Sequence, residues 1–190
     1  MISNMNRPRW LGAAIVTAVL AVAAIVLLIP ALNRAREQAR LTDCLSRVHG
    51  LGFAVAMYAD NYQGRCPVDK PRTLIGSFLL MSSTAGSPKI LICPCDSRPG
   101  VRTADNFGTL TTLNISYSYV PDMLWGDGRT NVVLWLDRIY TTEHGDKWPA
   151  DGNHGTTGGN ILFNDGHIGF FKELPENLRD QDGQPVVLSP

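Results

Sequence analysis

The chain has 190 residues and a formal net charge of 0. This length suffices for one domain with a hydrophobic core, but not for two well-packed domains plus a membrane anchor. Its basic residues are scattered rather than clustered, which argues against a nucleic-acid partner.

An uncharged apolar segment covers residues 10–29, and Thr17 is its one polar residue. About 20 such residues cross the hydrocarbon core of a bilayer, so the segment predicts a transmembrane helix. A cleaved signal peptide has a shorter apolar region, and a buried core helix has a polar stripe. We therefore expect a retained anchor preceded by a cytoplasmic tail, residues 1–9. Arginines flank both ends of the segment, so the positive-inside rule alone does not orient it.

After Pro30 the apolar residues recur every three or four positions as far as about Tyr62. This spacing predicts an amphipathic continuation of the helix over residues 30–62. Pro30 removes one backbone hydrogen bond, so a bend is expected there.

Residues 63–174 are expected to form a globular head. As far as about Arg102 this region is rich in Pro, Gly, Ser and Cys, which predicts connecting loops. Asp165-Gly166 supplies the residues of a type I′ turn, so the flanking runs should form a β-hairpin. The expected β-strands are residues 115–120, 131–137, 160–164 and 167–171.

The remaining tail, residues 175–190, is polar and rich in Pro and Asp, so we expect it to pack loosely. Together the elements predict an α+β fold, in which a long N-terminal transmembrane helix packs on a small, mainly antiparallel β-sheet.

Three stretches of the chain resemble a known family. The first runs from Leu28-Ile-Pro-Ala-Leu-Asn-Arg-Ala-Arg-Glu-Gln-Ala-Arg40 through Cys44-Leu-Ser and Met57-Tyr-Ala-Asp60 to Gly64-Arg-Cys-Pro67. The second comprises Ile92-Cys-Pro-Cys-Asp96, Tyr117-Ser-Tyr-Val-Pro121 and Val133-Leu-Trp-Leu-Asp137. The third is Asn153-His-Gly-Thr-Thr-Gly-Gly-Asn-Ile-Leu-Phe-Asn-Asp-Gly-His167. In order and spacing they resemble the prepilin-type pseudopilin-like proteins, in particular the family named for a His followed nine residues later by Asp-Gly.

The resemblance implies a pilin-like fold and a structural role, as a minor or tip subunit of a type II secretion or pilus-like apparatus. It also implies a single-pass protein of the bacterial inner membrane, with its C-terminal domain in the periplasm or otherwise extracytoplasmic. The expected partners are the membrane and other pilin-like or secretion-apparatus subunits, with no small-molecule substrate and no enzymatic activity. The family-motif residues are His154, Gly158, Gly159, Asn160, Asp165, Gly166 and His167.

The N-terminus departs from the family pattern. Family members carry a Gly-Phe cleavage site and a Glu four residues after the Phe, whereas alignment on Pro30 places Pro8, Arg9 and Ala13 there. The third stretch also has ten residues between His154 and Asp165, one more than the family spacing. The missing cleavage site leaves an alternative open, a stand-alone membrane-anchored binding protein with the same fold.

One group of residues could hold zinc or perform acid–base chemistry: Asp151, His154, Asp165 and His167. Asp165 belongs to the predicted turn, so we favour a structural role in which His154 hydrogen-bonds across the Gly-rich loop. A zinc-dependent extracytoplasmic hydrolase is the less favoured reading.

Calcium is the one ligand considered further, since related major pseudopilins bind it in loops. The candidate ligands in or beside loops are Asp122, Asp127, Asp137 and Asp151, without EF-hand spacing. No other cofactor is expected.

Four cysteines, Cys44, Cys66, Cys93 and Cys95, lie in the part expected outside the cytoplasm, where disulfides persist. Cys93-Pro-Cys95 lacks the usual Cys-x-x-Cys spacing of zinc sites, so disulfides are favoured over zinc. Spacing leaves three connectivities open. The resemblance favours Cys44–Cys93, at family-like positions, with the additional Cys66 and Cys95 paired to each other.

Overall fold

The computed structural model describes residues 9–130, 132–139, 147–175, 178 and 187–190. The chain forms two compact units, Met1–Arg40 and Leu41–Pro190. The expected cytoplasmic tail lies outside the described residues apart from Arg9.

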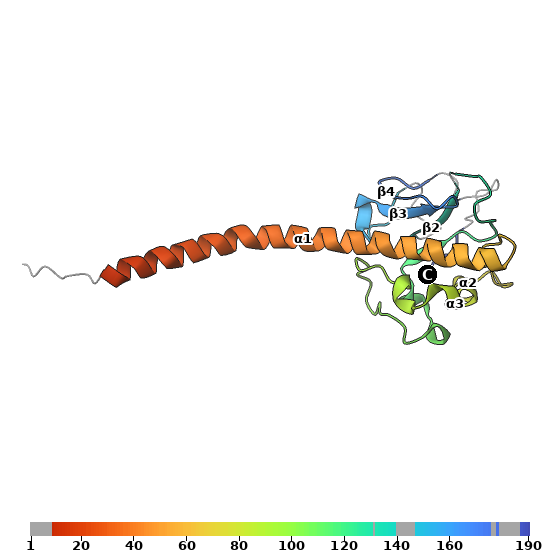
Figure 1. Ribbon diagram of the computed structural model, residues 1–190, viewed down its shortest axis with the longest axis horizontal. Helices are drawn as coiled ribbons and strands as arrows, with labels where there is room; N and C mark the ends of the chain where they lie inside the picture. Colours follow the sequence, from red (N-terminus) through yellow and green to blue (C-terminus); the bar gives the residue numbers. More distant parts are fainter. Residues whose placement is uncertain (1–8, 131, 140–146, 176–177, 179–186) are drawn as a thin grey trace, which may run out of the picture. The chain divides into compact units, whose positions relative to one another are not determined.

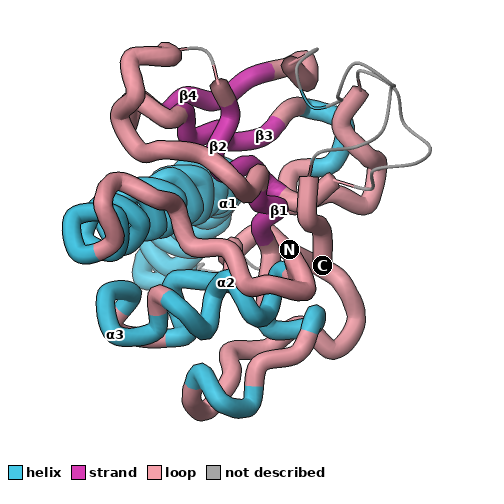
Figure 2. Tube along the Cα trace, turned by 90° about the vertical axis from the view of Figure 1, so that its right-hand side faces the viewer, coloured by secondary structure: helices cyan, strands magenta, loops and turns pink. Residues whose placement is uncertain are grey.

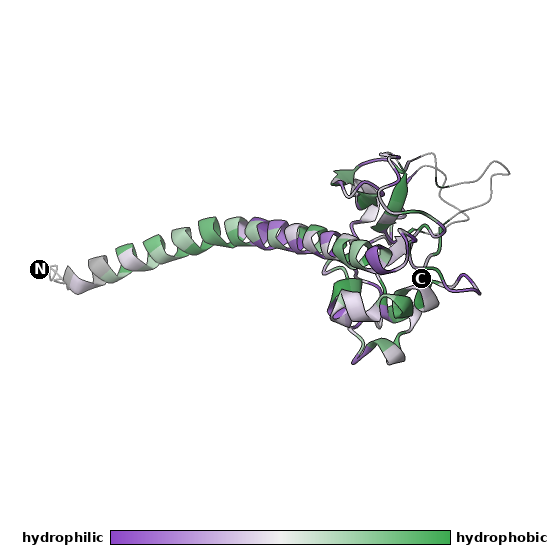
Figure 3. Cartoon of the chain, turned by 45° about the vertical axis from the view of Figure 1, so that its right-hand side comes forward, coloured by the Kyte–Doolittle hydropathy of each residue, from purple (hydrophilic) through white to green (hydrophobic). Residues whose placement is uncertain are grey.

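Helix α1, Arg9–Asn61, contains both the expected transmembrane segment and its continuation, and Pro30 lies inside it. The residues of its N-terminal part are mostly hydrophobic (Figure 3), and Val19, Leu20 and Leu27 are more than half exposed. This helix is the one among the described residues that is long and apolar enough to cross a membrane. The structure thus contains a single candidate membrane helix, near the N-terminus.

The second unit contains a four-stranded antiparallel sheet in the order β1-β2-β3-β4, whose strands are labelled in Figure 2. Its strands are β1 (Tyr117–Tyr119), β2 (Val133–Asp137), β3 (Gly159–Phe163) and β4 (Ile168–Phe171). Each expected strand is confirmed, although the observed strands are slightly shorter or shifted. The expected α+β fold, with a long N-terminal helix and a small antiparallel sheet in a pilin-like layout, is also confirmed.

The region expected to consist of loops contains two short helices, α2 (Leu74–Leu80) and α3 (Ser82–Ala85). Thr73 begins α2, because its Oγ1 accepts a hydrogen bond from the backbone N–H of Gly76 at 3.0 Å. Within this unit the sheet lies on one side of the C-terminal part of α1, and α2 and α3 lie on the other (Figures 1 and 2). The remaining regular segments are 3₁₀ turns at Pro88–Leu91, Phe107–Thr109, Thr112–Asn114 and Gly155–Thr157.

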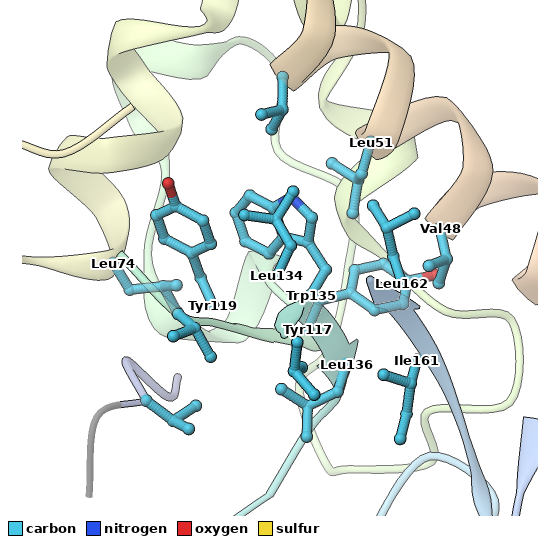
Figure 4. Close-up of a cluster of buried hydrophobic side chains, with 14 of the residues drawn as sticks. Val48, Leu51, Leu74, Tyr117, Tyr119, Leu134, Trp135, Leu136, Ile161 and Leu162 are labelled. Carbon is cyan, nitrogen blue, oxygen red and sulfur yellow. The ribbon is translucent and has the colours of Figure 1, made fainter. Parts of the chain in front are cut away.

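The hydrophobic core lies between these layers (Figure 4). The buried face of α1 contributes Val48 and Leu51, at helical spacing. Trp135 of β2 stacks between Phe78 of α2 and Tyr119 of β1, with ring centroids 4.7 Å and 4.0 Å apart. Every residue of β2 and β3 is buried, so both faces of the central strands are covered.

The β3–β4 hairpin differs from the expected type I′ turn. That turn requires a positive φ at both central residues, but among Asn164, Asp165 and Gly166 only Gly166 has one, 88°. The Gly166 N–H donates to Phe163 O, and the Phe163 N–H donates to His167 O, both at 2.9 Å. The connection is therefore a three-residue loop, a type I turn followed by a left-handed glycine.

The end of the C-terminal tail is packed rather than loose. Val187 is buried, and Leu188 exchanges two backbone hydrogen bonds with Tyr119, of 2.8 Å and 2.7 Å. Most of the expected loose tail, residues 176–177 and 179–186, lies outside the described residues.

Candidate metal centre

Four potential metal ligands from four separate segments meet in the second unit: Cys44, Cys93, Asp137 and His154. Cys44 comes from α1, and Cys93 follows the 3₁₀ turn Pro88–Leu91. Asp137 ends β2, and His154 precedes the 3₁₀ turn Gly155–Thr157. One donor atom from each residue lies within 4.8 Å of the others.

Helical spacing places Cys44 on the buried face of α1, one turn before Val48. On the same helix, Arg47 donates hydrogen bonds to the carbonyl oxygens of Lys89 at 3.1 Å and Ile92 at 2.7 Å. These bonds hold the segment that ends in Cys93 against the helix beside Cys44.

Two adjacent glycines shape the loop that carries His154. Gly158 has a φ of 137°, and a Cβ there would meet the carbonyl oxygen of Phe171 too closely. A Cβ at Gly159 would clash with the ring of Trp148. Gly158 and Gly159 therefore let the loop return tightly to β3, next to the cluster.

Asp137 is the most strongly hydrogen-bonded member of the cluster. Its Oδ1 accepts from Asn153 Nδ2 at 2.7 Å, and its Oδ2 accepts from the Asn160 backbone N–H at 2.6 Å and from Asn160 Nδ2 at 2.9 Å. His154 Nε2 lies 3.2 Å from Oδ2. A buried carboxylate needs such partners to remain charged.

The two thiols also have polar neighbours. Cys44 Sγ lies 3.3 Å from Asn160 Nδ2, 3.6 Å from the Tyr117 hydroxyl and 3.6 Å from Asp137 Oδ1. Cys93 Sγ accepts from the Cys95 N–H at 3.4 Å and lies 3.8 Å from His154 Nε2.

Burial and these contacts shift the pKa values of the cluster. A hydrogen bond from Cys93 outweighs burial and lowers the pKa of Cys44, whereas burial and that same hydrogen bond raise the pKa of Cys93. Burial disfavours the imidazolium, but hydrogen bonds to Asp137 and Cys44 and their charges raise the pKa of His154 to about 10. The metal-free cluster therefore places a Cys44 thiol of lowered pKa near a His154 imidazolium.

A thiolate beside an imidazolium is also the pair that activates catalytic cysteines. Such a nucleophile has to reach a substrate, but Cys44 and Cys93 are 0% and 1% exposed. The Asp137 and His154 side chains are 1% and 2% exposed. This closed arrangement suits a structural role better than catalysis.

The four residues considered together for zinc or acid–base chemistry do not form one site. Asp165 and His167 contact each other at the hairpin, at the far end of β3 from Asn160. Asp151 contacts Arg138 at 3.7 Å. Of these four residues, His154 alone belongs to the cluster. Its Nε2 contacts Asp137, Cys93 and the side-chain amide of Asn160.

The four aspartates considered for calcium are also dispersed. Asp122 pairs with Arg72, Asp127 with Arg129 and Asp151 with Arg138, and Asp137 lies in the cluster. Over the described residues, the sole group of three or more His, Cys, Asp or Glu ligands is the cluster itself. The aspartates thus form no common calcium site.

The cysteines are thiols in the structure, and neither expected disulfide is formed among these four described residues. Cys44 and Cys93 do lie together, as the resemblance implies. Cys66 is buried beside Asp127 and Tyr119, where burial raises its pKa to about 12, whereas Cys95 follows Cys93 in its loop.

Comparisons of the chain with family models, with curated proteins and with solved structures found no match.

Proposed function

We propose that this protein is a membrane-anchored, pilin-like structural subunit with an extracytoplasmic C-terminal unit. The supporting observation is the division of α1 into two kinds of surface. The most hydrophobic stretch of its N-terminal part is not buried against any other part of the chain. The continuation of the helix from Leu41 instead supplies core residues to the second unit.

The exposed apolar part needs a cover, because water solvates such a surface poorly. Leu, Ile and Val each favour bilayer insertion by about 0.3 to 0.6 kcal/mol at the centre of a helix. A lipid bilayer supplies this cover for a single subunit, and neighbouring helices would supply it in an assembly. The bacterial inner membrane and an extracytoplasmic C-terminal unit come from the family resemblance.

The second unit supports a structural role rather than an enzymatic one. Its most reactive group of side chains is closed to solvent, and its sheet serves to pack against α1 and α2. A stand-alone membrane-anchored binding protein is the second candidate, favoured by Pro8, Arg9 and Ala13 at the positions of the cleavage and docking residues.

The test is membrane retention of the full chain in a bacterial host. Leu20→Arg combined with Ile25→Arg should shift the protein from the alkali-resistant membrane fraction to the soluble fraction, because each Arg costs about 2.5 to 3.5 kcal/mol at the bilayer centre. Phe53→Arg is the matched control, since Phe53 is 60% exposed on the same helix but lies in the second unit.

Protease added to spheroplasts should digest the second unit, and crosslinking should join the chain to other pilin-like subunits. A chain that resists protease until the membrane is lysed would contradict the orientation. A protein that enters the membrane but crosslinks to no such subunit would favour the stand-alone binding protein.

A further inference from the structure

We propose that Cys44, Cys93, Asp137 and His154 bind one Zn²⁺ as a structural centre of the second unit. The four donors already lie together before any ion is added, with one ligand atom of each residue within 4.8 Å of the others. This centre is independent of the proposed assembly role, because all four ligands belong to the same compact unit.

Three distances between ligand atoms are close to the edge lengths of a zinc tetrahedron, and the two that involve Asp137 end on its two different oxygens. Zn–N and Zn–O bonds of about 2.0 Å and Zn–S bonds of about 2.3 Å give tetrahedral edges of about 3.3 to 3.8 Å. His154 Nε2 lies 3.2 Å from Asp137 Oδ2, Cys44 Sγ lies 3.6 Å from Asp137 Oδ1, and Cys93 Sγ lies 3.8 Å from His154 Nε2. One ligand atom from each of the four residues lies within 4.8 Å of the others, so an ion would draw the donors inward by about 1 Å or less.

The donor types select the class of metal. Two thiolates, an imidazole and a carboxylate suit Zn²⁺, whereas Ca²⁺ and Mg²⁺ require six or more oxygen ligands. With all four side chains at most 2% exposed, the site has four protein ligands and no position open to water. Closed four-ligand sites of this kind are structural.

A second layer of polar groups orients the ligands. The Asn160 side-chain amide contacts both Cys44 Sγ and Asp137 Oδ2, and the Cys95 N–H points at Cys93 Sγ. Asn153 holds the other oxygen of Asp137. N–H donors directed at sulfur and carboxylate atoms stabilise anionic ligands, as outer partners do in known metal sites.

Zinc binding would also balance the charges of its ligands. Binding releases the protons of the thiols and of the imidazolium, and the two thiolates and the Asp137 carboxylate of the bound form carry three negative charges. Zn²⁺ with a neutral His154 would reduce the buried net charge to one negative unit, spread over hydrogen-bonded ligands. If Cys44 and Cys93 formed a disulfide, the N–H groups of Asn160 and Cys95 would instead face disulfide sulfurs, which accept hydrogen bonds more weakly than thiolates.

The test uses the full chain, extracted in detergent without chelators and analysed for metals. We expect one zinc ion per chain, lost on treatment with a strong chelator together with a fall in the melting temperature of the second unit. The variants Cys93→Ser and His154→Gln should lose the zinc. The controls Cys66→Ser and His49→Gln should keep it, since Cys66 is a buried cysteine elsewhere and His49 is exposed on α1.

Two measurements on the wild-type chain keep the proposal testable if the ligand variants fail to fold. Co²⁺ exchanged for Zn²⁺ should give the visible absorption of tetrahedral cobalt and a thiolate-to-cobalt charge-transfer band. Cys44 and Cys93 should resist alkylation until the chelator is added. A wild-type chain without zinc, a Cys44–Cys93 disulfide found by non-reducing peptide mapping, or retention of zinc by both ligand variants would overturn the proposal.

Discussion

Gly166 occupies a backbone conformation that other residues adopt only with strain. Its φ is 88°, and a Cβ placed there would meet only Trp125, at 3.8 Å. The cost of a side chain thus comes from the backbone and not from lack of space. Gly166→Val should lower the free energy of unfolding by about 1 to 3 kcal/mol, because a β-branched residue is poorly tolerated at positive φ.

The control for this prediction is Gly166→Asn, because Asn accepts the left-handed conformation more readily. Urea denaturation of both variants should give a clearly smaller loss for Asn. If the Val variant and the wild type had the same free energy of unfolding, the hairpin would not depend on this glycine.

The ion pair between Asp96 and Arg98 lies in the loop that follows Cys93. Arg98 donates to Asp96 Oδ2 at 2.7 Å and to the carbonyl oxygen of Ile115 at 2.5 Å, and Ser116 donates to the same carboxylate at 2.7 Å. The side chain of Asp96 is fully buried and that of Arg98 is 14% exposed. Although burial opposes it, Arg98 and Ser116 lower the pKa of Asp96.

Arg98→Met would leave the buried Asp96 carboxylate without its counter-charge. Removing one partner of a buried pair costs about 3 to 5 kcal/mol, and we expect the lower end because Arg98 is slightly exposed. Asp96→Asn in the Arg98→Met background should recover part of the loss. Chemical denaturation of the two single variants and the double variant measures this coupling, and strictly additive effects would contradict it.

The residues of the cluster show what sequence reasoning missed. An extracytoplasmic location favours disulfides, and the family resemblance favours the pairing Cys44–Cys93, whereas both cysteines are free thiols in the structure. Asp137 ends β2, as the expected strand over residues 131–137 implies, but its burial to 1% exposure does not follow from a position beside a loop. A carboxylate at the end of the run Val133-Leu-Trp-Leu-Asp137 was itself a signal, since a buried charge requires partners. Which partners it meets depends on the tertiary fold, and no spacing along the chain predicts that.

At the scale of elements, the strands were predictable because short apolar runs alternate with strong turn residues. The type of the β3–β4 turn was not, since Asp165-Gly166 suits both a two-residue and a three-residue connection, and register decides between them. Helix α2 was missed because its seven residues are few for a periodicity argument. Thr73 directly before the apolar run of α2 is a residue type that often begins a helix, and it was the one signal in the sequence for this helix.

The part of α1 after Leu41 belongs to the hydrophobic core of the second unit. Replacing one of its large side chains by Ala should therefore destabilise the protein only where that side chain lies on the buried face of the helix. Leu51 is fully buried, and Phe53 is 60% exposed two positions later. Leu51→Ala should cost about 2 to 5 kcal/mol, the range for buried leucines. Phe53→Ala should change stability by no more than about 0.5 kcal/mol.

Thermal denaturation in detergent, followed by near-ultraviolet circular dichroism, compares the two variants. Similar losses for both would mean that α1 does not present this face to the sheet.

At the scale of the whole molecule, the N-terminal sequence decides what the anchor can do. We expect no processing at Pro8-Arg9, because Pro8 fixes φ and lacks the amide that an extended peptidase substrate offers. The retained tail would keep Arg7 and Arg9 beside the membrane and hold the helix there rather than release it into a filament. Intact-mass analysis should therefore find a chain that does not start at Arg9 and has no methylated amine at that residue.

The same residues argue against a filament made of this subunit alone. In the resembling family, a buried Glu compensates the charged N-terminal amine of a neighbouring subunit, and either charge left unpaired in an apolar core is costly. Ala13 stands at the position of that Glu and offers no such partner. A tip position remains compatible with this loss, because no subunit above it has to be contacted. Overexpression of the full chain without other pilin-like subunits should yield no filaments in electron micrographs, and filaments built from this chain alone would contradict the expectation.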